Sequence, residues 1–302
     1  MDKHIDFKVI YLKENQGHGN ARRISLENTT NELVALMDSD DVSYPNRFEK
    51  QLKLFEEDPN LDICGGHITE FVGEENNIIG RREVELTDNM IKKDLKKRCP
   101  MNQVTVMFKK AAYELAGGYI DWFCEEDYYL WARMALKGCR FQNIDEDVVN
   151  VRTGLDMSSR RGGYKYFKSE RRMQRFLLKN KLISFARYIY NVLLRFGGEV
   201  ILPNSLRNKA FKATRSKYVK KEIVCSNEHG IKKNGNFSVT MCVYGKDNPN
   251  WFDKSLNSIV VNQTLKPSEL VLVVDGPIPE SIQKVIDKYR SIIYRGLENE
   301  KI

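Results

Sequence analysis

Residues 33–41, LVALMDSDD, place an apolar run directly before three acids, Asp38, Asp40 and Asp41. A short apolar run bounded by polar residues predicts a buried strand of a parallel sheet. Carboxylates held so close together repel one another and are costly to desolvate, whereas a bound cation removes both penalties. We therefore interpret this stretch as a strand that ends in a cation site. The alternative is an acidic turn that precedes a helix beginning near Pro45.

Segments with strand and helix patterns alternate on both sides of this stretch. Apolar runs rich in β-branched residues predict strands, and apolar residues three and four positions apart predict helices. Strands are expected at 7–12, 32–37, 62–72, 237–245 and 269–276, helices at 18–29, 44–58, 87–98, 125–138, 164–181, 184–196, 250–263 and 279–290, and a strand followed by a helix within 104–119. Such alternation predicts an α/β fold with a mostly parallel central sheet flanked by helices.

Composition narrows the class of protein. The 302 residues, 41% of them hydrophobic, are enough for one large α/β domain or two small ones. The sequence has neither an apolar run of membrane-spanning length nor the apolar core of a signal peptide, so we expect a cytoplasmic protein. Its six cysteines and four histidines are scattered, which favours reduced thiols over disulfides or a zinc site.

The net charge of +8 is concentrated in one segment. Residues 160–221 hold eighteen Lys or Arg and two Glu, which leaves the rest of the chain at −8. Basic segments of this kind contact anionic surfaces such as nucleic acid or inner-leaflet lipid. The apolar and aromatic residues among the basic ones within 164–196 suit a helix lying on a membrane surface. The alternative is that these helices pack against the catalytic body with basic outer faces.

Several blocks together resemble glycosyltransferase family 2. The resemblance rests on FKVIYLKENQGHGNARR (7–23), ALMDSDD (35–41), NQVTVMFKKAAYELAGGY (102–119), EEDYYLWARM (125–134), FSVTMCVYGKDN (237–248) and LVLVVDGP (270–277). It implies the GT-A fold, a Rossmann-like arrangement that binds nucleotide sugars. No single block is specific by itself, but their joint occurrence is.

The order of the blocks departs from the family pattern. The two blocks that resemble the family's opening β-α-β-α unit stand here at the C-terminus, so the chain resembles a circularly permuted member. We expect the second part of the GT-A domain at 1–163, basic helices at 164–203, a basic linker at 204–236 and the first part of the domain at 237–302. Two alternatives remain open: a swapped dimer in which this unit completes a neighbouring molecule, and a reading frame that joins two genes.

On the donor side, the resemblance assigns a role to each matched residue. It implies that Asp40 lies nearest a Mg²⁺ or Mn²⁺ ion and that Asp38 lies near the metal or the ribose. Asp275 would accept a hydrogen bond from uracil, although a glycine follows it where the family usually has a second acid. Tyr244 would pack on the base, and Arg22 would lie near the nucleotide. Strand carboxyl ends and helix N-termini are suitable places for such contacts.

On the acceptor side, the resemblance implies that Asp127 is the base that removes the proton of the acceptor hydroxyl. Glu126 would flank it. An inverting transfer needs such a base. The alternative is a helix N-terminus enriched in acids to suit its dipole.

A basic loop at 151–170 resembles the segment that closes over the diphosphate in many family members. The resemblance implies that one of Arg152, Arg160 and Arg161 holds phosphate oxygens. The alternative is a loop whose arginines are solvated.

The function implied is inverting transfer of a sugar from a nucleotide donor, expected to be UDP-linked, to a hydroxyl of a saccharide or lipid-linked saccharide. Bacterial surface polysaccharide synthesis is the implied setting, with peripheral contact at the inner membrane face. The alternative from another class is an inactive transferase-like body that binds anionic membrane or nucleic acid. We expect no nucleic-acid partner, because the sequence contains no nucleic-acid-binding motif.

Overall fold

The computed structural model describes residues 5–120, 122–154, 162–203 and 236–298. Its strands are β1 (Asp6–Tyr11), β2 (Leu33–Asp38), β3 (Val42–Ser43), β4 (Ile63–Phe71), β5 (Ile78–Arg82), β6 (Met107–Lys109), β7 (Phe141–Arg152), β8 (Phe237–Tyr244) and β9 (Glu269–Asp275). Its helices are α1 (His18–Glu27), α2 (Arg47–Glu57), α3 (Asp88–Leu95), α4 (Lys110–Leu115), α5 (Glu126–Leu136), α7 (Tyr164–Lys179), α8 (Phe185–Arg195), α10 (Pro249–Val260) and α11 (Glu280–Glu298), with a π-helical turn at Phe196–Ile201.

One mixed sheet of nine strands runs through the molecule in the order β1-β9-β8-β2-β6-β4-β7-β3, with β5 paired to β4. The first four strands are parallel, as the apolar runs predicted. Beyond β2 the sheet becomes mixed, because β6 is antiparallel to both β2 and β4. The predicted α/β class is therefore confirmed, and the parallel order is limited to part of the sheet.

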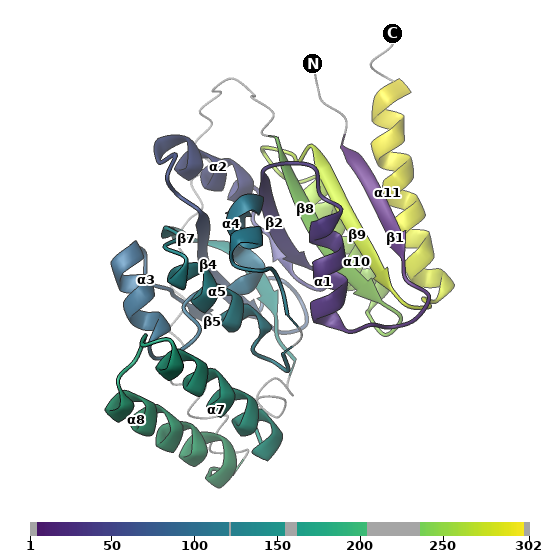
Figure 1. The fold of residues 1–302 in the computed structure, drawn as a ribbon. Coiled ribbons are helices and arrows are strands. Elements are labelled where there is room, and N and C mark those ends of the chain that lie inside the picture. Colours follow the sequence, from purple (N-terminus) through teal and green to yellow (C-terminus); the bar gives the residue numbers. More distant parts are fainter. Residues whose placement is uncertain (1–4, 121, 155–161, 204–235, 299–302) are drawn as a thin grey trace.

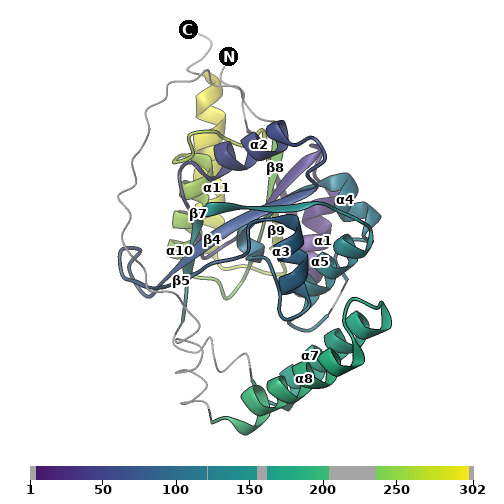
Figure 2. The ribbon, with the colours of Figure 1, turned by 90° about the vertical axis from the view of Figure 1, so that its left-hand side faces the viewer.

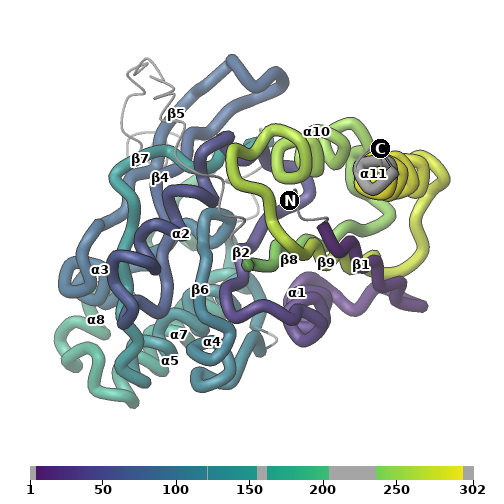
Figure 3. The backbone as a smooth tube through the Cα atoms, turned by 90° about the horizontal axis from the view of Figure 1, so that it is seen from above, coloured from purple at the N-terminus to yellow at the C-terminus, as the bar shows by residue number. Residues whose placement is uncertain are grey.

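Helices cover both faces of this sheet (Figure 1, Figure 3). One core joins α2, α10 and α11 to the sheet, and the other joins α1, α3, α4, α5 and α7 to the opposite face. Successive residues of β2 serve the two cores in turn: Ala35 and Met37 face the first, and Val34 and Leu36 face the second. This burial on both sides explains why the sequence of β2 is continuously apolar.

The C-terminal unit occupies the middle of the parallel strands. Strand β8 pairs with β2 and β9 pairs with β1, so residues from both ends of the chain share one ladder. The start of β1 and the end of α11 lie at the same end of the molecule (Figure 1, Figure 3). The four predicted segment boundaries remain predictions, and most of the linker predicted at 204–236 lies outside the described residues.

Three strands were not predicted from the sequence: β3, β5 and β7. Strand β7 is the longest in the sheet and runs parallel to β4 from Ile63 opposite Phe141 to Phe71 opposite Arg152. Its acids at 145–147 interrupt the apolar pattern, and the register of β4 shifts opposite them. The loop predicted at 151–170 was therefore wrong at its start, where β7 ends at Arg152, whereas the overlapping prediction of a helix from residue 164 is confirmed by α7.

Helices α7 and α8 form a separate layer at the end of the molecule away from the top of α11 (Figure 2). They were predicted as basic amphipathic helices, and the helix boundaries agree to within about two residues. None of the helices in the described part of the chain is long and apolar enough to cross a bilayer.

Glu269 ties the C-terminal unit to the N-terminal part. Its side chain is only 2% exposed and accepts hydrogen bonds from Lys8 Nζ at 2.5 Å, from Thr30 N and Oγ1 at 2.9 Å each, and from Ser238 Oγ. Burial alone would raise the pKa of Glu269, but these donors, led by Lys8, outweigh it and lower the pKa. The carboxylate form is therefore the one that stabilises the fold.

We predict that Glu269→Gln lowers the free energy of unfolding by about 2 kcal/mol at pH 7, because a charged hydrogen-bonded pair is lost. Because the pKa of Glu269 is depressed in the fold, its contribution is present above the usual glutamate pKa of about 4.3 and declines as the pH falls below it. Chemical denaturation at neutral and acidic pH measures both effects. Glu280→Gln is the matched control, since Glu280 is 82% exposed in its pair with Lys284. Equal stability of Glu269→Gln and the wild type at pH 7 would contradict this account.

Candidate functional site

Four parallel strands end at one edge of the sheet, and the predicted donor-side residues stand there. In the register, Asp38 lies opposite Cys242, and Tyr244 lies opposite Asp275. The carboxyl ends of β2, β8 and β9 therefore bring Asp38, Tyr244 and Asp275 to neighbouring positions, although they are far apart in the sequence. This edge is where open α/β sheets place their ligands.

A buried ion pair connects the acidic motif to α1. Arg22 Nη2 lies 2.7 Å from Asp38 Oδ1, and the Arg22 side chain is 8% exposed. Burial alone would lower the pKa of Arg22, but the neighbouring acidic groups, led by Asp38, together outweigh it and raise the pKa. Burial would likewise raise the pKa of Asp38, but the charge and hydrogen bond of Arg22, with the charges of His18 and Arg47, together outweigh it and lower the pKa. Both groups are therefore ionised at neutral pH.

The same guanidinium reaches the acceptor-side acids. Arg22 Nη2 also donates to Gln103 Oε1 at 3.0 Å, and Arg22 Nη1 lies 3.9 Å from Glu126 Oε1. Arg22 was predicted to lie near the nucleotide. The structure places it between Asp38 at the end of β2 and Glu126 at the start of α5, so one side chain links the two groups of acids.

Asp40 and Asp41 have different surroundings. Burial, followed by the charges of Asp38 and Asp247, raises the pKa of Asp40 to about 6. Asp41 is 3% exposed and its Oδ1 accepts a hydrogen bond from the backbone N–H of Arg152 at 2.8 Å. Burial also raises the pKa of Asp41. Asp41 therefore secures the motif to β7, whereas Asp40 belongs to a concentration of negative charge that a cation would relieve.

Arg152 holds the acidic motif in place and is not part of a loop. It is the last residue of β7, its side chain is 8% exposed, and its guanidinium lies 4.5 Å from the ring centres of both Phe71 and Trp251. Its Nε donates to the carbonyl of Asp40 at 3.2 Å and its Nη1 to that of Gly73 at 2.7 Å. The prediction that it lies in a flexible basic loop was wrong. Arg160 and Arg161, predicted beside it, lie outside the described residues.

Asp275 organises the loop between β1 and α1. Its Oδ1 accepts from Gln16 N at 2.7 Å and its Oδ2 from Gly17 N at 3.2 Å. The next residue, Gly276, has φ +88°, and a Cβ there would lie 2.7 Å from Asn15 N. A glycine is therefore required at the place where the family usually has a second acid, because the loop packs directly against it.

Tyr244 and a residue not predicted, Asp247, border the other side of this edge. The Tyr244 side chain is 41% exposed at the end of β8, so a planar ligand could stack on it. Asp247 Oδ2 accepts from Tyr244 N at 3.1 Å and from Ser39 Oγ at 2.9 Å. Asp247 therefore connects the loop after β8 to the acidic motif after β2.

The acceptor-side acids stand on the first turn of α5. Asp127 Oδ1 accepts from Tyr128 N at 2.6 Å, and Cys99 Sγ lies 3.6 Å from Asp127 Oδ2 as a donor. Burial, followed by the charge of Asp127, raises the pKa of Glu126 to about 7, while Arg22 opposes the rise. A carboxyl group with a pKa near neutrality is suited to proton transfer.

His18 and Gln103 were not predicted to belong to this site. The positive charge of Arg22, followed by burial, lowers the pKa of His18 to about 4, so its imidazole is neutral at pH 7. The spacing of four between His18 and Arg22 was a usable signal, since residues i and i+4 share a helix face. Gln103 had no such signal, because it reaches Arg22 from the 3-10 turn Gln103–Thr105.

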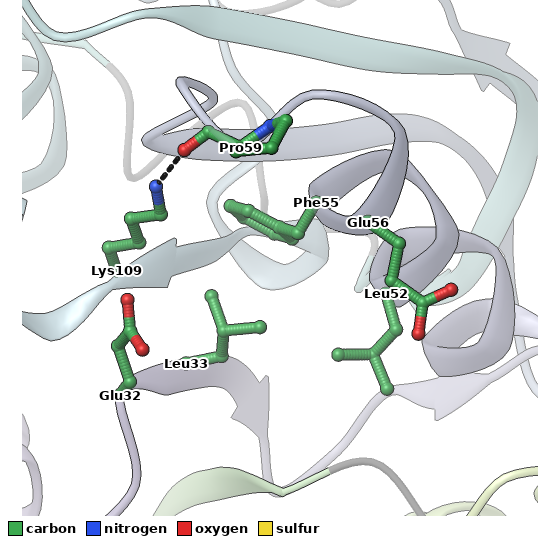
Figure 4. A pocket seen from close by; sticks show the side chains of 7 residues that line it. All are labelled: Glu32, Leu33, Leu52, Phe55, Glu56, Pro59 and Lys109. Carbon is green, nitrogen blue, oxygen red and sulfur yellow. Dashed lines mark hydrogen bonds between the residues drawn. The ribbon is translucent and has the colours of Figure 1, made fainter. Parts of the chain in front are cut away.

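A pocket of about 280 Å³ lies at the opposite end of β2 from Asp38. Figure 4 shows Leu33 and Phe55 on its apolar side and the ammonium of Lys109 hydrogen-bonded to the carbonyl of Pro59. It is separate from the site described above. Among the described residues, no group of three or more His, Cys, Asp or Glu side chains is arranged to hold a metal ion by itself.

Comparison with known proteins decides the family. The model of glycosyl transferase family 2 matches residues 1–115. An uncharacterized glycosyltransferase of Haemophilus influenzae is 35% identical over 208 residues, which cover 69% of this chain and 77% of the relative. The chain belongs to glycosyl transferase family 2. This confirms the resemblance stated from the sequence, and the mixed α/β fold is consistent with the GT-A fold of the family.

Two further relatives have named roles. An amylovoran biosynthesis glycosyltransferase of Erwinia amylovora is 34% identical over 62% of this chain and 70% of its own length. A UDP-Gal:alpha-D-GlcNAc-diphosphoundecaprenol beta-1,3-galactosyltransferase of Escherichia coli is 31% identical over 70% of this chain and 76% of its own length. Glycosyltransferase activity in polysaccharide biosynthesis is thus the role that the family and its named members support.

Proposed function

We propose that this protein transfers a sugar from a UDP-sugar to a hydroxyl of a saccharide acceptor, with inversion at the anomeric carbon. The observation that carries the proposal is the position of Arg22, 2.7 Å from Asp38 on the donor side and 3.9 Å from Glu126 on the acceptor side. Two groups of acids with opposite tasks are thereby held next to each other, as a transfer between two bound substrates requires.

The donor nucleotide would bind at the ends of β8 and β9. Asp275 uses its two oxygens to hold the loop after β1, and each oxygen has a second lone pair for a ligand donor such as a uracil N–H. Tyr244 offers an exposed ring beside it. The UDP-linked donor in the name of the Escherichia coli relative supports UDP over other nucleotides.

Asp38 and Asp40 would hold a Mg²⁺ or Mn²⁺ ion, which would neutralise the charge that develops on the departing diphosphate. The raised pKa of Asp40, caused by burial and then by Asp38 and Asp247, supports the fit, since it marks a buried carboxyl group beside two other acids, only partly offset by Arg152. Two carboxylates suffice, because Mg²⁺ commonly takes its remaining ligands from water and substrate phosphates.

Asp127 would act as the base, with Glu126 beside it. It would accept the proton of the acceptor hydroxyl while that oxygen forms a bond to the anomeric carbon of the donor. The bond from that carbon to the diphosphate oxygen breaks, and UDP leaves with the electron pair. One displacement from the opposite face inverts the configuration, and Cys99 donates to the Asp127 oxygen that does not accept from Tyr128 N.

The acceptor we propose is a lipid-linked saccharide of a bacterial surface polysaccharide. The printed names of two relatives support this class, one for amylovoran biosynthesis and one for transfer to a sugar on diphosphoundecaprenol. Such an acceptor requires the enzyme to work at a membrane surface.

We predict that Asp40→Ala lowers UDP release from a UDP-sugar with Mn²⁺ by at least about 10²-fold, because the leaving group loses its electrostatic support.

Asp127→Asn should lower transfer about 10²–10⁴-fold while leaving UDP affinity unchanged, because only the proton acceptor is lost. Coupled UDP detection and calorimetry measure both quantities, and NMR of the product gives the anomeric configuration. Glu57→Gln, which removes a surface carboxylate on α2, is the control. The alternative of an inactive binding module would be favoured by a different result. In that case the folded protein binds anionic vesicles or DNA but neither binds nor turns over any UDP-sugar.

We also propose that the chain carries the family's elements in a circularly permuted order. The family model matches only residues 1–115, yet β8 and β9 from the C-terminal unit supply Tyr244 and Asp275 at the donor edge. The start of β1 and the end of α11 lie at the same end of the molecule, so a short connection would restore the usual order (Figure 1, Figure 3).

We predict that a rearranged chain, in which residues 236–302 precede residues 1–203 and the linker is left out, keeps the oligomeric state, stability and UDP affinity of the natural order. The reason is that the same strands can pair in the same sheet when only the connections change. Light scattering, thermal unfolding and UDP titration provide the measurements. The swapped arrangement would be supported instead if the natural-order chain is a dimer and the rearranged chain is a monomer. A rearranged chain that folds but binds no UDP would contradict the proposed order.

A further inference from the structure

The helix α8 is oriented with its polar residues toward the protein. Asn191 is 2% exposed, and its amide donates to the carbonyl of Lys96 at 3.0 Å and to Gln174 Oε1 at 2.8 Å. Arg195 donates from Nε to Glu170 Oε2 at 2.6 Å and from Nη2 to the carbonyl of Lys97 at 2.8 Å. The inner side of α8 therefore meets α7 and the segment after α3 through hydrogen bonds, next to the partly buried Tyr188, which packs against the core.

The opposite side of α8 is an apolar face exposed to solvent. We call it the α8 stripe; its members are Phe185, Ala186, Ile189, Tyr190, Leu193 and Leu194. Their spacing of one, four, five, eight and nine positions puts them on one side of a helix. Phe185 is 67% exposed, Leu193 64% and Leu194 60%. Beyond the helix, Phe196 and Ile201 in the π-helical turn are exposed as well.

An exposed surface of this kind indicates a partner. Contiguous apolar patches are uncommon on soluble proteins and usually mark interaction sites, whereas single exposed apolar residues are ordinary. Here the apolar residues occupy consecutive turns of one helix whose inner side is satisfied. The sequence alone had left open the reverse arrangement, in which α7 and α8 pack by their apolar faces and expose basic ones.

The charges around the α8 stripe select an anionic partner. Residues 164–195 contain nine Lys or Arg and a single acid, Glu170. That acid is already paired with Arg195. Arg171, Arg175, Lys179 and Lys181 are all exposed on α7 and on the turn that leads to α8. On α8 itself, Arg187 lies 5.5 Å from the ring centre of Tyr190, a member of the stripe. An apolar and aromatic stripe on a pair of strongly basic helices is the composition of helices that lie in the interface of an anionic bilayer.

We propose that the α8 stripe seats this protein on an anionic lipid bilayer, with the apolar side chains below the headgroups and the basic ones among them. At 1.5 Å per residue, the eleven residues of α8 are only about 16 Å long, about half of a bilayer's hydrocarbon core. The helix therefore lies along the surface and does not enter as a span. The proposal rests on the proposed function in one respect: a lipid-linked acceptor explains why the enzyme would need to contact a membrane.

The position of the helix fits that purpose. The segment 96–99 contacts both α8 and the proposed base. The carbonyls of Lys96 and Lys97 accept hydrogen bonds from α8, and Cys99 donates to Asp127. Helix α7 is also fixed to the segment before α5, since Trp122 Nε1 donates to Ser169 Oγ at 3.0 Å. The bilayer would thus face the part of the molecule that carries the proposed base, at the end opposite the top of α11 (Figure 1, Figure 2).

Co-sedimentation with vesicles tests the proposal. The full chain is mixed with vesicles of equal parts phosphatidylcholine and phosphatidylglycerol, or with pure phosphatidylcholine, at low and high salt. We expect clear binding to the anionic vesicles that weakens with salt, because part of it is electrostatic. Leu193→Glu/Leu194→Glu should reduce the partition at least tenfold, and Arg175→Glu/Lys179→Glu should reduce it only on anionic vesicles. Leu115→Glu is the matched control, because Leu115 is 57% exposed on α4, away from the stripe.

Three results would overturn the proposal. The first is that the wild type does not sediment with anionic vesicles. If, in that case, the wild type is a dimer and Leu193→Glu/Leu194→Glu is a monomer, the stripe binds a second copy of the chain instead. The second is equal binding by the stripe variant and Leu115→Glu. The third is binding to duplex DNA that displaces vesicles and survives the stripe variant. UDP release without lipid is measured in parallel, and we expect the stripe variant to keep it. A protein that binds vesicles but releases no UDP would contradict the proposed function alone.

Discussion

The ion pair between the buried Arg22 and the partly buried Asp38 is the contact on which the candidate site depends. Asp38 is the last residue of β2 and Arg22 faces it from α1, so the pair fixes the helix to the end of the strand. An unpaired charge at this depth would be costly, and each partner removes the penalty of the other. The same guanidinium lies 3.9 Å from Glu126, so this contact also brings the acceptor-side acids of α5 next to the acidic motif. Within the residues that the structure describes, Asp40 has no ion pair of this kind, and burial followed by the charges of Asp38 and Asp247 raises its pKa to about 6.

The candidate site also depends on the strand order of the sheet, and not only on the contact between Arg22 and Asp38. Asp38 can only stand beside Tyr244 and Asp275 because β8 and β9 lie between β1 and β2. The C-terminal unit therefore belongs to the centre of the donor edge. Glu269 secures it at the other end of the same strands, through Lys8 on β1 and Thr30 after α1. A chain that lost this unit would lose the middle of its parallel sheet.

Much of the fold was predictable from local patterns. Apolar runs identified the parallel strands, because strands buried on both faces are continuously apolar, and LVALMDSDD identified the strand whose end brings Asp38 next to β8. Strand β7 was missed because its pairing with β4 depends on residues some eighty positions away and its own sequence is rich in acids. For the same reason Arg152 was predicted in a loop, although two aromatic rings and two carbonyls hold it.

Two further features could not be predicted from the sequence: the partners of individual side chains and the direction in which a helix faces. The sequence placed Arg22 in the site but gave no sign that it would pair with Asp38 and approach Glu126, since those contacts depend on how α1 and α5 meet. The amphipathic pattern of α8 was visible, but periodicity does not say which side faces the body. The hydrogen bonds of Asn191 and Arg195, together with the exposure of the α8 stripe, show that the apolar side faces out.

The most direct test of the central claim compares two neighbouring arginines of α1. Arg22→Met removes the link between the donor and acceptor sides, whereas Arg23→Met removes a surface pair with Glu27 and leaves the site intact. The measurement is the rate of sugar transfer from a UDP-sugar, with folding verified by circular dichroism. The account predicts a loss of at least about 10²-fold for Arg22→Met and no change for Arg23→Met. Equal rates for the two folded variants would contradict it.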